Sequence, residues 1–271
     1  MRRTNYFVST ACLVASLALT ARAQIGATWT RVCDISTVGN QATQGPFAEG
    51  YDISDNGRFV CFTNFDPLDP RDVNGYAAGS YDVYVRDLLL DQTILVSMDA
   101  ANTYSAGGCA GNGSGGPALS STGRYVAFAS YSTSLVAGDA GIDWDVFVRD
   151  TQTNTTLRCS VTSTGGEPNN NCTGQAISGD GRYVCFDSTA TDILPAATSG
   201  AKQVYRFDRL TGQVALVSCN AAGVAANQYS YAANVSADGR YVVFTSDANN
   251  LGPIDANGSS DVYRKDMLTG Q

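Results

Sequence analysis

One pattern occurs four times along this chain, and a pattern that returns at a nearly fixed spacing restricts the fold more than any other sequence feature. Its shared glycine stands at positions 57, 123, 181 and 239, so successive copies lie 66, 58 and 58 residues apart. Four agreeing copies exclude a chance match. The copies read Ile53-Ser-Asp-Asn-Gly-Arg-Phe-Val-Cys-Phe62, Leu119-Ser-Ser-Thr-Gly-Arg-Tyr-Val-Ala-Phe128, Ile177-Ser-Gly-Asp-Gly-Arg-Tyr-Val-Cys-Phe186 and Val235-Ser-Ala-Asp-Gly-Arg-Tyr-Val-Val-Phe244.

Each copy predicts four short antiparallel strands. The Asn-Gly, Thr-Gly and Asp-Gly steps lie between two apolar runs, where a tight hairpin needs residues that tolerate positive φ. The following Arg-Tyr-Val-x-Phe run alternates as a half-buried strand does. A polar loop then leads to a strand of the Asp-Val-Tyr-Val-Arg-Asp type, first seen at 82–87, and a further turn leads to an outer strand such as 93–97.

One such sheet cannot bury both of its faces, so the copies must stack, and radial stacking gives an all-β propeller with four-stranded antiparallel blades. The repeats span about 46–104, 117–170, 174–228 and 231–271. Residues 28–36 match the outer strands of the repeats, and we expect this N-terminal strand to complete the last blade and hide its free edge. A four-bladed ring and a fragment of a larger propeller both remain open.

The motif Ser-x-Asp-Gly-Arg-Tyr-Val-x-Phe, followed by Asp-Val-Tyr/Phe-x-x-Asp and Thr-Gly, resembles the TolB-like, WD40-like β-propeller repeat (PD40). The resemblance covers nearly all of the chain after its first 23 residues. It implies an exported bacterial protein with a binding or scaffolding role, or a propeller domain beside a peptidase domain. The chain departs from the usual TolB plan, because its repeats are longer, four are visible rather than six, and no TolB N-terminal domain precedes them.

Residues 1–23 are predicted to be a signal peptide. Arg2 and Arg3 give a basic start, residues 6–20 are apolar, and Ala21-Arg22-Ala23 fits the small-x-small cleavage rule. We therefore expect a secreted or periplasmic protein whose propeller domain is 24–271. No later segment approaches the roughly 18 consecutive apolar residues of a membrane-spanning helix, so no membrane span is predicted.

The charge balance bears on partners. The chain has 25 Asp and Glu residues against 17 Lys and Arg, a formal net charge of −8. This balance argues against nucleic acid, which attracts basic patches. It favours divalent cations or other proteins as partners.

No catalytic residue is assigned. The chain contains no histidine, which excludes catalysis by Ser-His-Asp or Cys-His groups and any His-ligated metal centre. The Arg and Asp that recur once per repeat, at 58, 124, 182 and 240 and at 87, 150, 208 and 266, are interpreted as structural ion pairs or turn caps, because a catalytic site is used once.

Calcium is the one cofactor that the sequence suggests. Hard cations bind several carboxylate and carbonyl oxygens, often on a loop that a glycine lets turn sharply. Such loops precede the third strand of three repeats, whereas the third repeat has Lys202 and Gln203 there instead. The alternative is that Asp, Asn and Gly are simply good turn formers. The candidate ligands are Asp255, Asn257 and Asp261 in the fourth repeat, Asp72, Asn74 and Asp82 in the first, and Asp139, Asp143 and Asp145 in the second.

Seven cysteines follow the predicted cleavage site. Cys61 and Cys185 hold the same place in two repeats, between Val and Phe of a strand, which predicts small buried side chains. Cys109 and Cys172 are placed in loops, and export permits disulfides. A bond between Cys159 and Cys172 is the pairing that we expect.

The leading functional hypothesis is a non-enzymatic binding module that engages a protein or glycan through its loops, where variation accumulates on such scaffolds. The inserted loop 65–80 is the favoured partner surface, and 102–116 is the second. The alternative is the propeller portion of a secreted hydrolase, a peptidase or glycosidase, whose catalytic part is missing or Asp-based.

Overall fold

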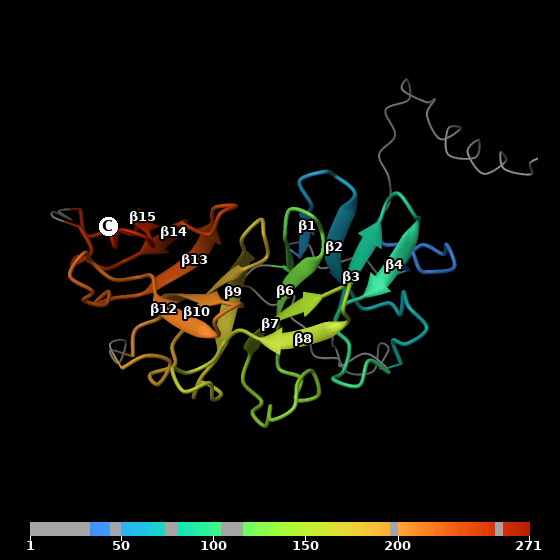
Figure 1. The fold of residues 1–271 in the computed structure, drawn as a ribbon, viewed down its shortest axis with the longest axis horizontal. Coiled ribbons are helices and arrows are strands. Elements are labelled where there is room, and N and C mark those ends of the chain that lie inside the picture. Colours follow the sequence, from blue (N-terminus) through green and yellow to red (C-terminus); the bar gives the residue numbers. More distant parts are fainter. Residues whose placement is uncertain (1–32, 44–49, 74–80, 104–115, 196–199, 253–256) are drawn as a thin grey trace, which may run out of the picture. The chain divides into compact units, whose positions relative to one another are not determined.

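The computed structural model describes residues 33–43, 50–73, 81–103, 116–195, 200–252 and 257–271. Within them the chain forms four antiparallel sheets in chain order (Figure 1). No helix in this described part has the length and apolar character that crossing a membrane requires. The strands are β1 (Tyr51–Ile53), β2 (Phe59–Asn64), β3 (Asp82–Asp87) and β4 (Gln92–Leu95); β5 (Ala118–Leu119), β6 (Tyr125–Ser130), β7 (Asp145–Asp150) and β8 (Thr155–Arg158); β9 (Cys172–Ile177), β10 (Tyr183–Ser188), β11 (Gln203–Asp208) and β12 (Gln213–Leu216); β13 (Ser230–Val235), β14 (Tyr241–Ser246) and β15 (Asp261–Asp266).

Each sheet is a meander in which successive strands pair, which confirms the predicted fold class of four-stranded antiparallel blades. The first three sheets have four strands each, and the fourth has three described strands. The second strand of each sheet pairs with the third in the same register, so that Phe62 faces Tyr84 and Phe128 faces Phe147. These cross-strand rings stack at centroid distances of 5.9 Å in both sheets, which is a favourable aromatic geometry.

The glycine of the repeated motif serves both its own hairpin and the contact with the preceding repeat. Gly181 has φ +72°, and a Cβ built there would lie 2.0 Å from the ring of Tyr125. Gly239 covers Tyr183 in the same way, and Gly123 covers Phe59. Only a residue without a side chain fits between the turn and the aromatic ring of the repeat before it.

The recurring Arg and Asp form one bidentate ion pair per repeat, as the structural interpretation predicts. In the third repeat, Arg182 donates Nε–H and Nη2–H to Asp208 at 2.9 and 2.7 Å. Asp208 also accepts the backbone N–H of Leu210 in the next turn. The Arg182 hydrogen bonds lower the pKa of Asp208 to about 2. The other pairs are Arg58 with Asp87, Arg124 with Asp150 and Arg240 with Asp266.

Hydrophobic clusters join each sheet to the next one. Cys61 and Val83 of the first sheet pack with Phe128 and Phe147 of the second. Cys185 of the third sheet packs with residues of the fourth. Both cysteines are fully buried, which confirms their predicted role as small core side chains. None of the clusters that the described residues form joins the last sheet to the first.

A pair of equivalent tyrosines gives a test of this packing. Tyr84 donates its buried hydroxyl to Asp72, whereas among the described residues the buried hydroxyl of Tyr205 has no hydrogen-bond partner. An unsatisfied buried hydroxyl carries a desolvation penalty. We therefore expect Tyr205→Phe to raise the free energy of unfolding by about 1 kcal/mol and Tyr84→Phe to lower it by about 1 kcal/mol. Urea unfolding of the two variants checks this, and equal shifts for both would contradict it.

The described part of the predicted closing strand contacts the first sheet. Thr93 donates its hydroxyl to the carbonyl of Ile35, and Thr37 donates its N–H to the carbonyl of Leu68 at 2.9 Å. The remainder of that strand, 28–32, lies outside the described residues. Residues 33–42 form the hairpin that follows an outer strand, since Ile35 bridges Gln41 just as Cys219 bridges Ala225 after β12. The hairpin after β12 lies on the sheet that follows it, where Lys265 donates to the carbonyl of Cys219 at 2.9 Å. Residues 33–36 are therefore the hairpin after the predicted closing strand rather than part of the strand itself.

The predicted disulfide is wrong. Cys159 and Cys172 are both buried as free thiols. Cys172 begins β9 rather than lying in a loop, and burial raises the pKa values of both thiols. Both side chains belong to the apolar cluster between the second and third sheets, where they act as small hydrophobic groups. Cys109 lies outside the described residues.

Candidate functional site

A groove of about 710 Å³ lies along the innermost strands of the third and fourth sheets. Strands β9 and β13 supply most of its wall, together with residues just before β11 and β13. Its lining combines an ion pair, an amide and two tyrosines, from Asp187, Lys202, Gln175, Tyr229 and Tyr231. Inner strands of neighbouring blades are where a propeller scaffold leaves space for a ligand.

A bulge in each inner strand shapes this groove. Gly174 has φ +67° and Ala232 has φ +54°, and the two residues hold the same place in consecutive repeats. The pairing register shifts at both points. A bulge bends its strand and redirects the neighbouring side chains. Gly174 also makes room for Asp187, whose Oδ2 would lie 2.3 Å from a Cβ at that position.

Asp187 and Lys202 form the ion pair of the groove, with Nζ 2.6 Å from Oδ1. The Asp187 carboxylate is buried and also accepts the Thr173 hydroxyl at 3.1 Å. The equivalent positions in the other repeats are Thr63, Ala129 and Thr245. This acid therefore occurs once, unlike the framework aspartates that recur in every repeat.

The structure explains why Lys202 and Gln203 replace carboxylates in the third repeat. Lys202 pairs with Asp187, while Gln203 accepts the Ser218 hydroxyl at 2.6 Å. Ser218 in turn accepts the N–H of Val204 at 2.9 Å. In the second repeat, Asp145 accepts the Ser160 hydroxyl at 2.5 Å, and Ser160 in turn accepts the N–H of Val146 at 2.9 Å. Because an amide and a carboxylate both accept the serine hydroxyl here, this position requires a hydrogen-bond acceptor rather than a negative charge.

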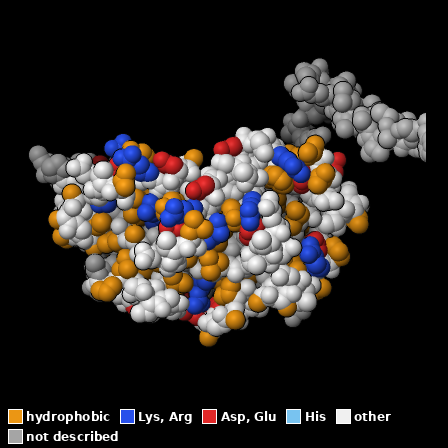
Figure 2. Space-filling model, in the orientation of Figure 1, with side chains coloured by type: hydrophobic (Ala, Val, Ile, Leu, Met, Phe, Trp, Pro, Cys, Tyr) orange, Lys and Arg blue, Asp and Glu red, His pale blue; other side chains and the backbone are white. Residues whose placement is uncertain are grey.

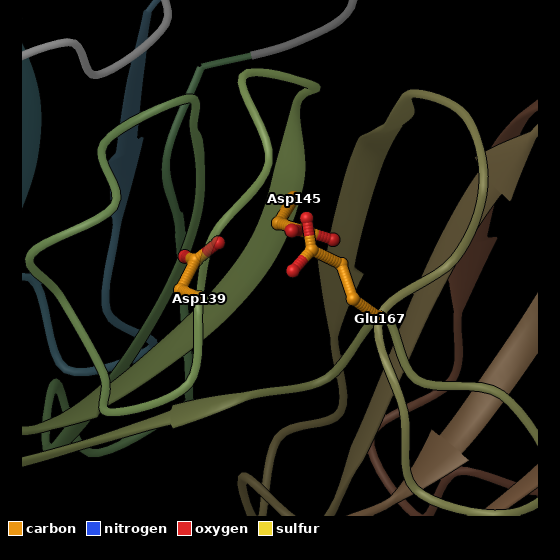
Figure 3. A group of neighbouring side chains, drawn as sticks. All are labelled: Asp139, Asp145 and Glu167. Carbon is orange, nitrogen blue, oxygen red and sulfur yellow. The ribbon is translucent and has the colours of Figure 1, made fainter.

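A second cluster gathers three carboxylates in the second repeat, those of Asp139, Asp145 and Glu167, whose nearest oxygens lie within 4.8 Å of one another. Figure 3 shows Asp145 on its strand with Glu167 and Asp139 directed toward it from loops. Asp139 and Asp145 are predicted calcium ligands. Glu167 was not predicted from the sequence, because its loop follows β8 rather than preceding the third strand of a repeat. The rarity of glutamate was an available signal, since only two Glu occur in the chain.

Arg158 lies at the centre of this acidic cluster. Its Nη1 is 3.5 Å from Asp139, 3.7 Å from Asp145 and 3.2 Å from Glu167. Burial raises the pKa of Asp145 to about 7 and also raises the pKa of Asp139. The carboxylate oxygens fit a hard cation by chemistry, but a guanidinium already contacts all three of them.

The other predicted calcium ligands that lie in the described residues do not meet in one cluster. Asp72 accepts the Tyr84 hydroxyl, and Asp82 accepts the Ser97 hydroxyl at 2.6 Å. In the fourth repeat, Asn257 donates to Asp261 across 3.4 Å. Asp143 lies near the second-repeat cluster in sequence but is not part of it. Asn74 and Asp255 lie outside the described residues.

Four repeated antiparallel sheets that pack face to face, with a groove along their inner strands, define the β-propeller class of repeat proteins. No family model matches the sequence, and no curated protein matches it either.

Solved structures give the remaining comparison. TolB from Acinetobacter baumannii is similar at 16% identity with a TM-score of 0.47, over 82% of this chain and 41% of that one. The β-propeller domain of the Trilobed protease from Pyrococcus furiosus is similar at 11% identity and 0.43, over 82% and 55%. Porphyromonas gingivalis dipeptidyl peptidase 4 is similar at 12% and 0.44, over 81% and 31%. The chain thus spans less than two thirds of each, and similarity at this level assigns neither activity nor partner.

Proposed function

We propose that this protein is an exported, non-enzymatic binding scaffold that holds a glycan or a protein segment in the groove between β9 and β13. The observation that carries the proposal is the ion pair of Asp187 and Lys202 beside Tyr229, a set that occurs in one repeat only. Functional groups are used once on a repeated framework, whereas framework contacts recur. Export rests on the predicted signal peptide 1–23.

The chemistry of the groove favours an uncharged, hydroxyl-rich ligand. The charges of Asp187 and Lys202 cancel, so the ligand need not carry a charge. Tyr229 is 54% exposed and offers an aromatic face, and Gln175 adds an amide close by. Aromatic side chains with one apolar and one polar end suit ligands of mixed character such as a sugar. On the face in view in Figure 2, basic side chains lie in several separate places among acidic and apolar ones, which supports a partner other than nucleic acid.

An Asp-based hydrolase is less well supported by the acidic cluster. Asp145, whose pKa near 7 would suit a general acid, is buried. Its carboxylate accepts the Ser160 hydroxyl, as Gln203 accepts from Ser218 in the next repeat. A side chain held in this way acts as framework. The alternative, a propeller portion of a secreted hydrolase, would place catalysis in another part of the protein.

Calcium binding stays a prediction. The convergence of Asp139 and Asp145 with Glu167 supports it. The contact of Arg158 with all three carboxylates opposes it, because an ion would have to displace a buried guanidinium.

A glycan array probed with the labelled protein tests the proposed groove. We expect specific binding whose affinity falls about five- to thirtyfold on Tyr229→Ala, because loss of the ring removes an apolar contact of about 1 to 2 kcal/mol. Tyr131→Ala is the matched control, since Tyr131 is also exposed but belongs to the second repeat. Binding that is lost equally in both variants, or that appears for no glycan or peptide ligand, would contradict the proposal.

A further inference from the structure

Each repeat of this chain joins the next through recurring contacts, two of which occur at all three junctions and one at the first two. The first is the turn glycine of one repeat lying on the aromatic ring of the repeat before it, as Gly181 does on Tyr125 and Gly239 on Tyr183. Only glycine fits in this contact, because a Cβ at Gly239 would lie 1.9 Å from the ring of Tyr183.

The second contact is a backbone hydrogen bond between neighbouring hairpin turns. The N–H of Asp55 in the first repeat donates to the carbonyl of Ser121 in the second, at 3.1 Å. The N–H of Ser121 donates to the carbonyl of Gly179 in the third, at 2.9 Å. These two bonds link the turns of the first three repeats, and Ser121 of the second repeat both donates and accepts.

The third contact buries one face of each sheet against the next sheet. Val83, Val146 and Val204, the second residues of the third strand in the first three sheets, are all fully buried. Their partners come from the following sheet in every case. Val262 holds this position in the last sheet and is 78% exposed, and Val243, equivalent to the buried Cys61 and Cys185, is 41% exposed.

The first sheet has the complementary face partly open. Ile53 is 56% exposed, although its equivalents Leu119 and Ile177 are buried against the preceding sheet. Gly57 has φ +68° with no described atom within 4 Å of its built Cβ, whereas each later turn glycine lies on a ring. Among the described residues, no turn glycine lies on the ring of Tyr241.

We propose that the last sheet of one copy receives the first sheet of a second copy, through the junction that the chain already uses three times internally. In this arrangement Gly57 of the second copy lies on Tyr241, its Ile53 covers Val262 and Val243, and the Ala237 N–H faces its Asp55 carbonyl. A head-to-tail contact gives a closed ring when the rotation from copy to copy brings the last copy back to the first. Two chains joined by two such junctions form a closed dimer.

The first experiment measures the mass of the protein in solution, expressed with residues 1–23 in place and purified after export. Sedimentation equilibrium at micromolar concentration should give twice the mass of one chain. Val262→Asp and Ile53→Asp should each raise the dissociation constant by about 100-fold or more, because each dimer then buries two unpaired carboxylates. Both side chains are exposed in the single chain, so we expect both variants to fold. Leu210→Asp changes an equally exposed apolar residue away from the junction and should leave the dimer intact.

Mixing the two variants separates a second copy from other occupants. A mixed pair has one junction with both substitutions and one with neither, so dimers should return when Val262→Asp and Ile53→Asp are combined. If the last sheet instead receives the first sheet of its own chain, the wild type is monomeric, each variant unfolds at lower temperature, and mixing changes nothing. That result overturns the proposal, as does a monomeric wild type whose stability neither variant alters.

Discussion

Gly181→Ala should lower the free energy of unfolding by about 3 kcal/mol or more. The backbone at Gly181 has φ +72°, where an L-residue with a Cβ costs about 1 kcal/mol relative to glycine. The new Cβ would also lie 2.0 Å from Cδ2 and 2.7 Å from Cγ of Tyr125. The ring cannot move aside easily, because the guanidinium of Arg209 lies 4.0 Å from its centroid on the adjoining repeat. Overpacking of this kind typically costs 1 to 3 kcal/mol.

Gly212→Ala is the matched control for this experiment. Gly212 has φ +70° in a turn of the same repeat, and no described atom lies within 4 Å of its built Cβ. The control therefore isolates the backbone cost, about 1 kcal/mol. Urea unfolding followed by far-UV circular dichroism gives both values. If the two variants lose equal stability, the contact between turn and ring does not hold neighbouring repeats together.

The contrast between these glycines also shows what sequence could and could not predict about the fold. Strands β2, β6, β10 and β14 follow from the alternating pattern after each Gly-Arg step, because the period of a strand is local. The positive φ of Gly181 follows from the hairpin. Its second role does not, because Tyr125 belongs to another repeat, 56 positions earlier in the chain. Contacts between repeats depend on how the sheets stack, which a pattern within one repeat does not specify.

The place of 33–36 illustrates the same limit. These residues match outer strands in sequence, and the structure gives them the hairpin that follows an outer strand. The sequence match therefore locates this segment but not the residue at which its strand ends. The bonds from Thr93 and to Leu68 place the hairpin on the first sheet, while 28–32, the rest of the predicted closing strand, lie outside the described residues.

The candidate site was predictable only in part. The exchange of carboxylates for Lys202 and Gln203 was visible in the aligned repeats, and both residues prove to have defined partners. Asp187 was not singled out, because its neighbour in space comes from a loop 15 positions away. The tyrosines of the groove gave no signal either, since Tyr is common throughout the chain. The groove is recognisable because its residues differ from their equivalents in the other repeats. Only the structure shows that these differing residues lie together.

Asp145→Asn should stabilise the protein at pH 8, in contrast to most changes of a buried polar residue. The pKa of Asp145 is raised from 3.8 to about 7, chiefly by burial. The folded protein then binds a proton that the unfolded chain has released, so its free energy of unfolding falls as pH rises from about 4 to about 7. Asparagine keeps an acceptor for the Ser160 hydroxyl, as Gln203 does for Ser218. We expect a gain on the order of 2 kcal/mol at pH 8 and none near pH 4.

The measurement is urea unfolding of wild type and variant between pH 4 and pH 8, with a chelator present. The groups that face Asp145 are Arg158, Asp139 and Glu167, with the Cys172 thiol also close enough to feel its charge. Arg158 keeps two carboxylate partners in the variant, so the change leaves no unpaired buried cation. Two parallel stability curves across this pH range would mean that Asp145 is ionised in the fold at no cost, and the prediction would be wrong.

The same two proteins decide between a calcium site and an internal ion cluster. An ion held by Asp139, Asp145 and Glu167 would stabilise the ionised form of Asp145, so millimolar calcium at pH 8 would raise the unfolding temperature of the wild type and not of Asp145→Asn. If Arg158 is the permanent counter-ion, calcium shifts both proteins equally or neither. In that case the net negative charge of the cluster is only partly neutralised, and the loss of stability toward neutral pH is the cost of retaining Asp145 where the third repeat has Gln203.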